Sequence, residues 1–195
     1  MGAVSNNQST ETGRQTGQDL TTCRLRLRSL CPADAPRVRD LSGNLRVARN
    51  LERVPHPYPE GLAETWIEAQ SAARARGEAY VFAIELAGDL IGVIGIERRG
   101  EGDYALGYWL GEPWWGQGLM SEAAARAVRF AFEDLNLPRL VSRYFVDNPA
   151  SGRILEKCGF QTVGRRPVTS RARSGEIDAV DVALSGAPTT RASAP

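Results

Sequence analysis

Residues Ala105–Ala127 read ALGYWLGEPWWGQGLMSEAAARA, a short apolar strand followed by a turn with two glycines and then by an alanine-rich helix. Gly116 and Gly118 allow the backbone of the turn to bend so that its N–H groups point outward. The helix that begins beside them adds the positive end of its dipole to those donors. This arrangement predicts a binding site for a diphosphate that needs no lysine.

A second informative stretch follows about one helix and one strand downstream. Residues Asp147–Phe160 read DNPASGRILEKCGF, in which Asn148 and Pro149 are typical of the first positions of a helix. The two stretches together predict a site for an acyl-coenzyme A thioester.

The two stretches resemble the GNAT superfamily of acetyltransferases, in particular its ribosomal-protein N-acetyltransferase (RimJ/RimL-like) branch. The motifs that carry the resemblance are GYWLGEPWWGQGLMSEA at 107–123 and NPASGRILEKCGF at 148–160. Supporting matches are RLRLR at Arg24–Arg28 and PHPYP at 55–59, which precedes a predicted helix with Trp66. The resemblance covers residues Thr22–Leu184 and implies an acyltransferase.

The hydrophobic pattern predicts a mixed α/β fold with one central sheet. Helical spacing occurs at 33–50, 60–76, 117–135 and 149–158, and strand-like runs occur at 24–28, 80–86, 90–97, 104–110, 140–145, 160–166 and 177–184. The resemblance implies that these elements form the GNAT fold, with a mixed, mostly antiparallel sheet of about seven strands that is splayed at the cofactor site and flanked by helices. We expect one domain at 22–184, a disordered N-terminal tail at 1–21 and a flexible C-terminal tail at 185–195, because both ends are polar.

Composition limits the possible classes of function. The chain has 195 residues, 42% of them hydrophobic, and a formal net charge of +1, so no single-sign field favours nucleic acid. No run approaches the roughly 20 apolar residues of a membrane span. Cys23, Cys31 and Cys158 follow no metal-ligand spacing, and His56 is the only histidine. We therefore expect a cytoplasmic protein, a monomer or homodimer, that binds no metal, nucleic acid or membrane.

The resemblance implies acetyl-CoA as the cofactor. Its pantetheine arm would pair with the strand at Tyr108–Leu110, while Asn148 and Ser151 occupy positions of polar contacts to the pantetheine and sulfur end. Arg153 and Lys157 lie four residues apart on one helix and are placed to meet the ribose phosphate. Asn148 can equally serve only as a helix cap, and the two cations as solvated charge. The predicted cofactor-binding residues are Tyr108, Trp109, Leu110, Trp115, Gly116, Gln117, Gly118, Leu119, Met120, Asn148, Ser151, Arg153 and Lys157.

Acetyl transfer requires a neutral amine, a base that takes its proton and a group that stabilises the leaving thiolate. Many superfamily members use a tyrosine as the acid, but the matching position here is Leu155, which leaves Ser151 as the catalytic candidate. The branch often carries an acidic residue two positions before GYW, where this chain has Ala105. Our candidate for the base is Glu97. Glu101, Asp103 and a bound water are the alternatives.

The acceptor stays open at this stage. The resemblance favours a protein N-terminal α-amine, whose pKa of about 7.7–8.0 asks less of a base than a lysine near 10.4. A small-molecule amine or antibiotic is the alternative acceptor, and a catalytically silent acyl-CoA-binding module is an alternative to the enzyme. A nucleotide-dependent oxidoreductase is disfavoured, because GQGLMS at 116–121 lacks the third glycine of the dinucleotide fingerprint and follows antiparallel strands.

Overall fold

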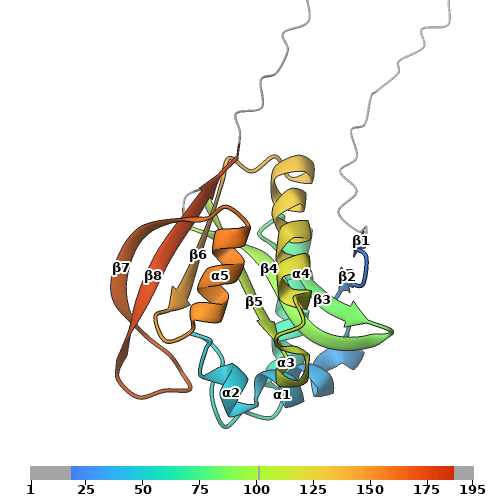
Figure 1. The fold of residues 1–195 in the computed structure, drawn as a ribbon. Coiled ribbons are helices and arrows are strands. Elements are labelled where there is room, and N and C mark those ends of the chain that lie inside the picture. The colour runs from blue at the N-terminus through green and yellow to red at the C-terminus, as the bar shows by residue number, and fades with distance from the viewer. Residues whose placement is uncertain (1–18, 101, 187–195) are drawn as a thin grey trace, which may run out of the picture.

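The computed structural model describes residues 19–100 and 102–186 (Figure 1). Glu101 and most of both expected tails therefore lie outside the described residues. At the two ends of the described region, Leu20 and Thr21 form strand β1, and Ser185 is the last residue of strand β8.

One eight-stranded sheet runs through the fold in the order β1-β2-β3-β4-β5-β6-β8-β7. The strands are β1 (Leu20–Thr21), β2 (Arg26–Ser29), β3 (Ala79–Leu86), β4 (Asp89–Arg99), β5 (Asp103–Leu110), β6 (Arg139–Phe145), β7 (Gln161–Thr169) and β8 (Glu176–Ser185). All neighbours are antiparallel except β5 and β6. The predicted mixed, mostly antiparallel sheet is confirmed, and the two-residue β1 is the additional strand.

The parallel neighbours β5 and β6 pair at one end only. Their register comprises Tyr104 with Leu140 and Ala105 with Val141, although β5 continues to Leu110 and β6 to Phe145. Beyond these pairs the strands diverge (Figure 1). The sheet is therefore splayed between β5 and β6, as the resemblance implied.

Five α-helices accompany the sheet in the described residues. They are α1 (Ala35–Ser42), α2 (Leu45–Ala48), α3 (Leu62–Ala75), α4 (Leu119–Arg129) and α5 (Pro149–Lys157), with short helical turns η1 (Pro32–Asp34), η2 (Glu112–Trp114) and η3 (Phe130–Asp134). The continuous helix expected at 33–50 is wrong. The helix α1 ends at its C-cap Gly43, the backbone leaves the helical conformation at Asn44, and the Asn44 side chain then accepts the Arg46 N–H to start α2.

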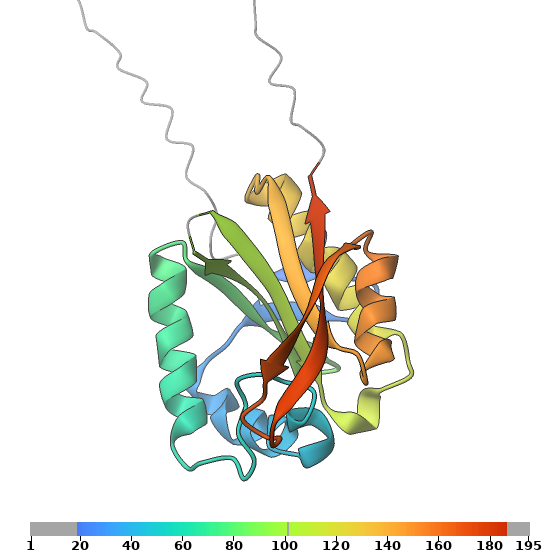
Figure 2. The ribbon, with the colours of Figure 1, turned by 90° about the vertical axis from the view of Figure 1, so that its left-hand side faces the viewer.

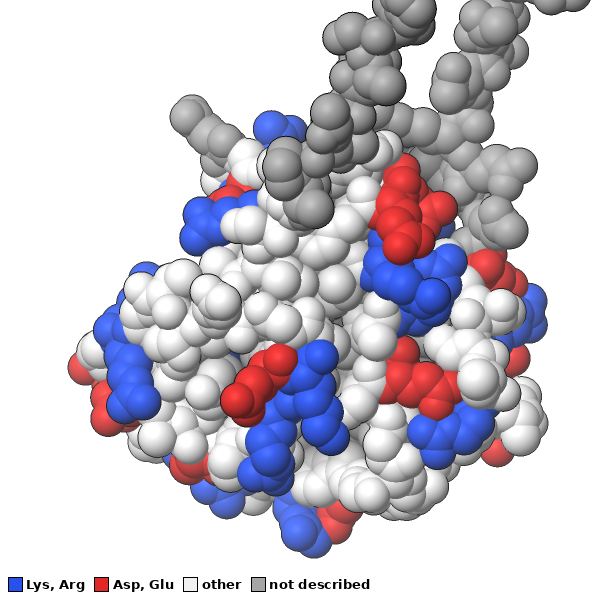
Figure 3. All heavy atoms as spheres, turned by 45° about the horizontal axis from the view of Figure 1, so that its top comes forward, with Lys and Arg blue, Asp and Glu red and all other residues white. Residues whose placement is uncertain are grey.

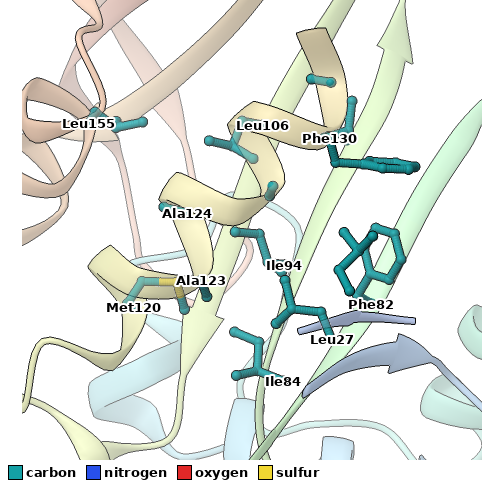
Figure 4. Close-up of a cluster of buried hydrophobic side chains, with 14 of the residues drawn as sticks. Leu27, Phe82, Ile84, Ile94, Leu106, Met120, Ala123, Ala124, Phe130 and Leu155 are labelled. Carbon is teal, nitrogen blue, oxygen red and sulfur yellow. The ribbon is translucent and has the colours of Figure 1, made fainter. Parts of the chain in front are cut away.

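Helices cover both faces of the sheet (Figure 2). One apolar cluster joins α4 to residues such as Phe82, Ile94 and Leu106 on one face (Figure 4). A second cluster joins α1 and α3 to Val81 and Val93 on the other face. Because side chains alternate along a strand, β3 is buried on both sides and reads as a continuous apolar run.

Charges are mixed over the surface. Figure 3 shows a face on which basic and acidic side chains lie in adjacent groups among uncharged residues. Within 19–100 and 102–186, no helix is both long and apolar enough to cross a membrane.

An ion-pair cluster fastens the start of α1 to the sheet. Both terminal nitrogens of Arg28 donate to the Asp34 carboxylate at 2.8 Å, and its Nε donates to Glu85 at 2.7 Å. The Cys31 N–H also donates to Asp34, whose side chain is 8% exposed. Burial disfavours the charged form of Asp34, but the hydrogen bonds from Arg28 and Cys31 outweigh it and lower the pKa of this carboxyl.

We expect Asp34→Asn to lower the free energy of unfolding by about 2 kcal/mol at pH 7, because Arg28 loses its charged partner. A carboxyl whose pKa is lower in the folded state stabilises the fold above its unfolded value near 3.9, and this contribution is lost as pH falls through the folded pKa. Urea unfolding should therefore show the difference between wild type and variant shrinking as pH falls below about 3.9. The exposed control Asp40→Asn should stay within about 0.5 kcal/mol of wild type. A pH-independent difference for Asp34→Asn would contradict the assignment.

Candidate active site

A cavity of about 1290 Å³ opens where β5 and β6 diverge. Its wall combines the C-terminal half of β5, the turn before α4, the start of α5 and residues of β8. Residues between α1 and α3 close it on the other side of the sheet. The volume exceeds the roughly 300–1,000 Å³ typical of a site for one small ligand, so an elongated ligand leaves space for a second molecule.

The turn before α4 has the backbone of an anion site. Gly116 and Gly118 both have φ of +75°, a left-handed conformation that favours glycine, and Gly118 is the N-cap of α4. A Cβ atom on Gly116 would meet nothing within 4 Å, so the space above it is open. The first N–H groups of α4 have no intrahelical partners and carry the positive end of the dipole. Gly116, Gly118 and Leu119 all line the cavity.

Arg24, which lies about 90 positions earlier in the chain, holds this turn in place. The Arg24 guanidinium donates to the Gln117 carbonyl at 3.0 Å and to the Glu122 carboxylate at 2.7 Å. In a planar trans peptide the C=O and the following N–H point in opposite directions. By drawing the Gln117 carbonyl toward itself, Arg24 directs the Gly118 N–H to the opposite side. Among the described residues, Gly118 lines the cavity and Arg24 does not.

A hydrogen-bonded pair bridges β5 and α5 beside the splay. The Tyr108 hydroxyl lies 2.9 Å from the Ser151 Oγ and 3.2 Å from the Ser151 carbonyl oxygen. Burial raises the pKa of Tyr108, and its hydrogen bond with Ser151 offsets only part of this shift, so the phenol stays protonated. The Asn148 side chain accepts the Ser151 N–H at 3.3 Å, which confirms its expected role as the cap of α5.

A carboxylate on β4 faces the position on β5 where an acid was expected. Glu97 pairs with Ala105 in the β4–β5 register, so both side chains lie on the same face, about 5 Å apart at their Cβ atoms. One terminal nitrogen of Arg53 donates to both Glu97 oxygens, at 2.9 and 2.8 Å. Glu97 lines the cavity and is 22% exposed. Asp103 lies at the strand end, 3.7 Å from Arg139, and does not line this cavity.

Most of the predicted site residues meet in this one cavity. Its lining includes Glu97, Tyr108, Trp109, Leu110, Trp115, Gly116, Gly118, Leu119, Met120, Asn148, Ser151, Arg153 and Lys157. Gln117 is the exception among the described residues, because its side-chain amide turns back to donate to the Pro113 carbonyl at 3.1 Å.

Other residues discussed from the sequence lie elsewhere. Leu155 is 1% exposed and belongs to the apolar core on the α4 face. Cys158 lies half-buried on a second, shallower hollow together with Cys23, and burial raises the pKa of its thiol. His56 contacts the Gly43 carbonyl oxygen at 2.9 Å. Within the described part of the chain, no group of three histidine, cysteine or acidic residues is arranged to hold a metal ion.

Sequence reasoning missed the residues that fix the site from a distance. Arg24 and Glu122 are 98 positions apart, and Arg53 and Glu97 are 44 positions apart. The only available signal was an arginine in an otherwise alternating strand and a glutamate in the first turn of a helix, which is common in any protein. The Tyr108–Ser151 contact likewise depends on how α5 packs against β5.

Comparison with known proteins assigns the chain to a family. The sequence matches the family model of the acetyltransferase (GNAT) domain over residues 24–161. It is 30% identical over 154 residues to the [ribosomal protein uS5]-alanine N-acetyltransferase of Escherichia coli K12, covering 74% of this chain and 79% of the relative. The chain belongs to the GNAT acetyltransferase family.

Solved structures share the fold of this GNAT acetyltransferase. RimL, a ribosomal L7/L12 alpha-N-protein acetyltransferase solved in complex with coenzyme A, superposes with a TM-score of 0.77 at 20% identity, over 87% of this chain and 98% of that one. The ribosomal-protein-S5-alanine acetyltransferase of Vibrio fischeri gives 0.75 at 18% identity, over 88% and 98%. GNAT acetyltransferases use acetyl-CoA, which is therefore the acetyl donor of this enzyme.

A negative charge at Gly116 should weaken acetyl-CoA binding. Gly116→Asp tolerates the positive φ but places a carboxylate in the open space above the turn, where it repels a diphosphate. We expect the Kd for CoA, measured by calorimetry, to rise at least about 10-fold. Gly116→Asn is the matched control, of equal size and without charge, and should stay within about 3-fold of wild type. Equal Kd values for the two variants would show that no anion binds at this turn.

Removal of the Arg24 guanidinium should weaken binding of the diphosphate part alone. We expect Arg24→Met to raise the Kd for CoA about 5- to 10-fold, because the Gly118 N–H is no longer oriented. Turnover with S-acetyl-pantetheine, which lacks the diphosphate, should not change. Arg26→Met is the control, because Arg26 is likewise exposed but lies on β2 and pairs with Asp19 and Glu85. An equal loss with both donors would point to general destabilisation instead.

Proposed function

We propose that this acetyltransferase moves the acetyl group of acetyl-CoA to the α-amine at a protein N-terminus. The observation that carries the proposal is the placement of the Glu97 carboxylate and the Tyr108–Ser151 pair on one cavity at the splay. Support comes from the E. coli relative over three quarters of the chain, whose name specifies a ribosomal-protein alanine as acceptor.

The geometry of the cavity supports an assignment of the cofactor residues. The diphosphate rests on the N–H groups from Gly116 to Met120, and the pantetheine arm pairs with β5 at Tyr108–Leu110, where the splay leaves the edge open. Asn148 and Ser151 contact the pantetheine and sulfur end. Trp115 is held by a 2.7 Å hydrogen bond to the Leu110 carbonyl and covers the turn. Arg153 and Lys157 on α5 meet the ribose phosphate.

Glu97 acts as the general base. Its carboxylate is fixed by Arg53 and accepts the amine proton, directly or through one water. An α-amine titrates near 8, so a carboxylate and a modest fraction of free amine suffice near neutral pH. A lysine side chain, with a pKa near 10.4, would demand a stronger base.

Ser151 stabilises the leaving thiolate. Its hydroxyl donates toward the sulfur while the Tyr108 hydroxyl donates to the Ser151 oxygen, a chain that polarises both groups. Tyr108 serves in this chain as a hydrogen-bond donor, since burial raises its pKa and keeps it protonated. This pair takes the place of the tyrosine that many superfamily members carry where this chain has Leu155.

The test is acetylation of short peptides with free N-termini, followed by mass spectrometry and thiol release. We expect Glu97→Gln to reduce kcat/KM at pH 7 by roughly 100-fold, with the Kd for acetyl-CoA unchanged, because only proton removal is lost. The loss should shrink above pH 8, where the amine deprotonates without help.

The exposed helix residue Glu156 supplies the control, and Glu156→Gln should retain wild-type rates. Ser151→Ala should lower kcat about 10-fold or more, with little pH dependence between pH 6 and 9. Blocked N-termini should not react. Acetylation of internal lysines with no α-amine product would contradict the proposed acceptor.

A further inference from the structure

The cavity continues across the sheet into an apolar recess on the α1–α3 face. We define this recess by Tyr58, Leu62, Trp66, Val81, Val93 and Trp109, all of which line the cavity. Tyr58, Trp66, Val81, Val93 and Trp109 also belong to the cluster under α1 and α3, whereas the turn before α4 and the start of α5 lie on the opposite face. The side chains of the recess therefore lie on the face opposite the turn and helix assigned to the cofactor, and Trp109 contributes its side chain to the recess and its backbone to the strand proposed for the pantetheine arm.

One glycine, Gly107, forms the open floor of the recess. It faces Gly95 in the β4–β5 register, on the same side of the sheet as Val93 and Trp109. The space above Gly95 is filled by Val81, whose Cγ2 would lie 2.8 Å from a Cβ atom there. Gly107 is exposed in the middle of a central strand, and a Cβ atom there would meet nothing within 4 Å. Its φ is not in the left-handed region, so the backbone does not require glycine. The residue instead leaves open a space that any side chain would fill.

The floor leads directly to the general base. Glu97 follows Gly95 by two residues and Ala105 precedes Gly107 by two, so all four lie on one face. Two residues along a strand span about 6.7 Å. If the amine lies at Glu97, a side chain on the carbon that bears the amine therefore reaches Gly107.

We propose that the preferred acceptor carries a large apolar group, an aromatic ring or a branched alkyl chain, on the carbon that bears its amine. This group enters the recess over Gly107 while the amine meets Glu97. Two indole rings and a phenol, all partly exposed, offer an apolar surface that a methyl or hydroxymethyl side chain cannot cover. The inference rests on the proposed function for the position of the amine, and it differs from the alanine that the E. coli relative's name specifies.

The experiment uses peptides that are identical except for the first residue, which is Phe, Leu, Ala or Ser. With wild-type enzyme and acetyl-CoA, we expect kcat/KM for Phe and Leu to exceed that for Ala and Ser about 10- to 100-fold. Gly107→Ala should reduce this ratio at least about 5-fold, because the added methyl enters the recess.

The control is Gly164→Ala on β7. It also places a methyl into open space on the cavity wall, away from the recess, and should leave the ratio unchanged. Thermal melting reports whether each variant folds. The preference among the four peptides is measured on the wild-type enzyme, so this part of the test does not depend on any variant.

Three results would overturn the apolar acceptor or distinguish its failure from failure of the proposed function. A wild-type preference for Ala or Ser overturns the apolar acceptor and leaves the protein N-terminus as the target. Acetylation of 2-phenylethylamine but of no peptide supports the recess and contradicts the proposed function. Faster transfer from hexanoyl-CoA than from acetyl-CoA, suppressed by Gly107→Ala, assigns the recess to the acyl chain and overturns the inference.

Discussion

The divergence of β5 and β6 is the constraint on which the site depends. Two register pairs join the strands at Tyr104 and Ala105, and the rest of β5 has a neighbour only at β4. A half-paired strand leaves N–H and C=O groups that need partners, so this edge suits a ligand that carries amide groups. The turn before α4 and the start of α5 follow the two diverging strand ends, which places donors for an anion and a hydroxyl at the same opening.

Local patterns in the sequence were enough to predict most of the elements, the turn before α4 and the cap of α5. The glycines at 116 and 118 and the cap at Asn148 depend on backbone conformation within a few residues, and the structure places them as expected. The break after Gly43 was missed although its signal is local, because Asn44 caps α2 and Asn is a favoured N-cap. Arg24 and Arg53 were missed for a different reason, since each acts on a residue more than 40 positions distant.

We propose that two departures from the family pattern are compensated in space rather than in sequence. Leu155 removes a phenol from α5, yet Tyr108 on the neighbouring strand contacts Ser151 from the opposite side. Ala105 removes a carboxylate from β5, yet Glu97 occupies the facing position on β4. Proton transfer and thiolate stabilisation require a group within hydrogen-bond reach, whichever strand carries it. Comparing motif positions alone therefore overlooks groups on other strands that can transfer a proton or stabilise the thiolate.

The same sheet is used differently on its two faces. On the α4 face, Ile94, Ile96 and Leu106 are almost fully buried and join β4 and β5 to the main core. On the α1–α3 face, Gly95 makes room for the Val81 side chain, whereas Gly107 leaves a space open, although a glycine inside a strand weakens it by roughly 0.5–1 kcal/mol. The packed face holds the strands in register, so the open face can keep a space that contributes nothing to packing. We propose that this gap beside a carboxylate serves selection of the acceptor, since packing of the fold does not require it.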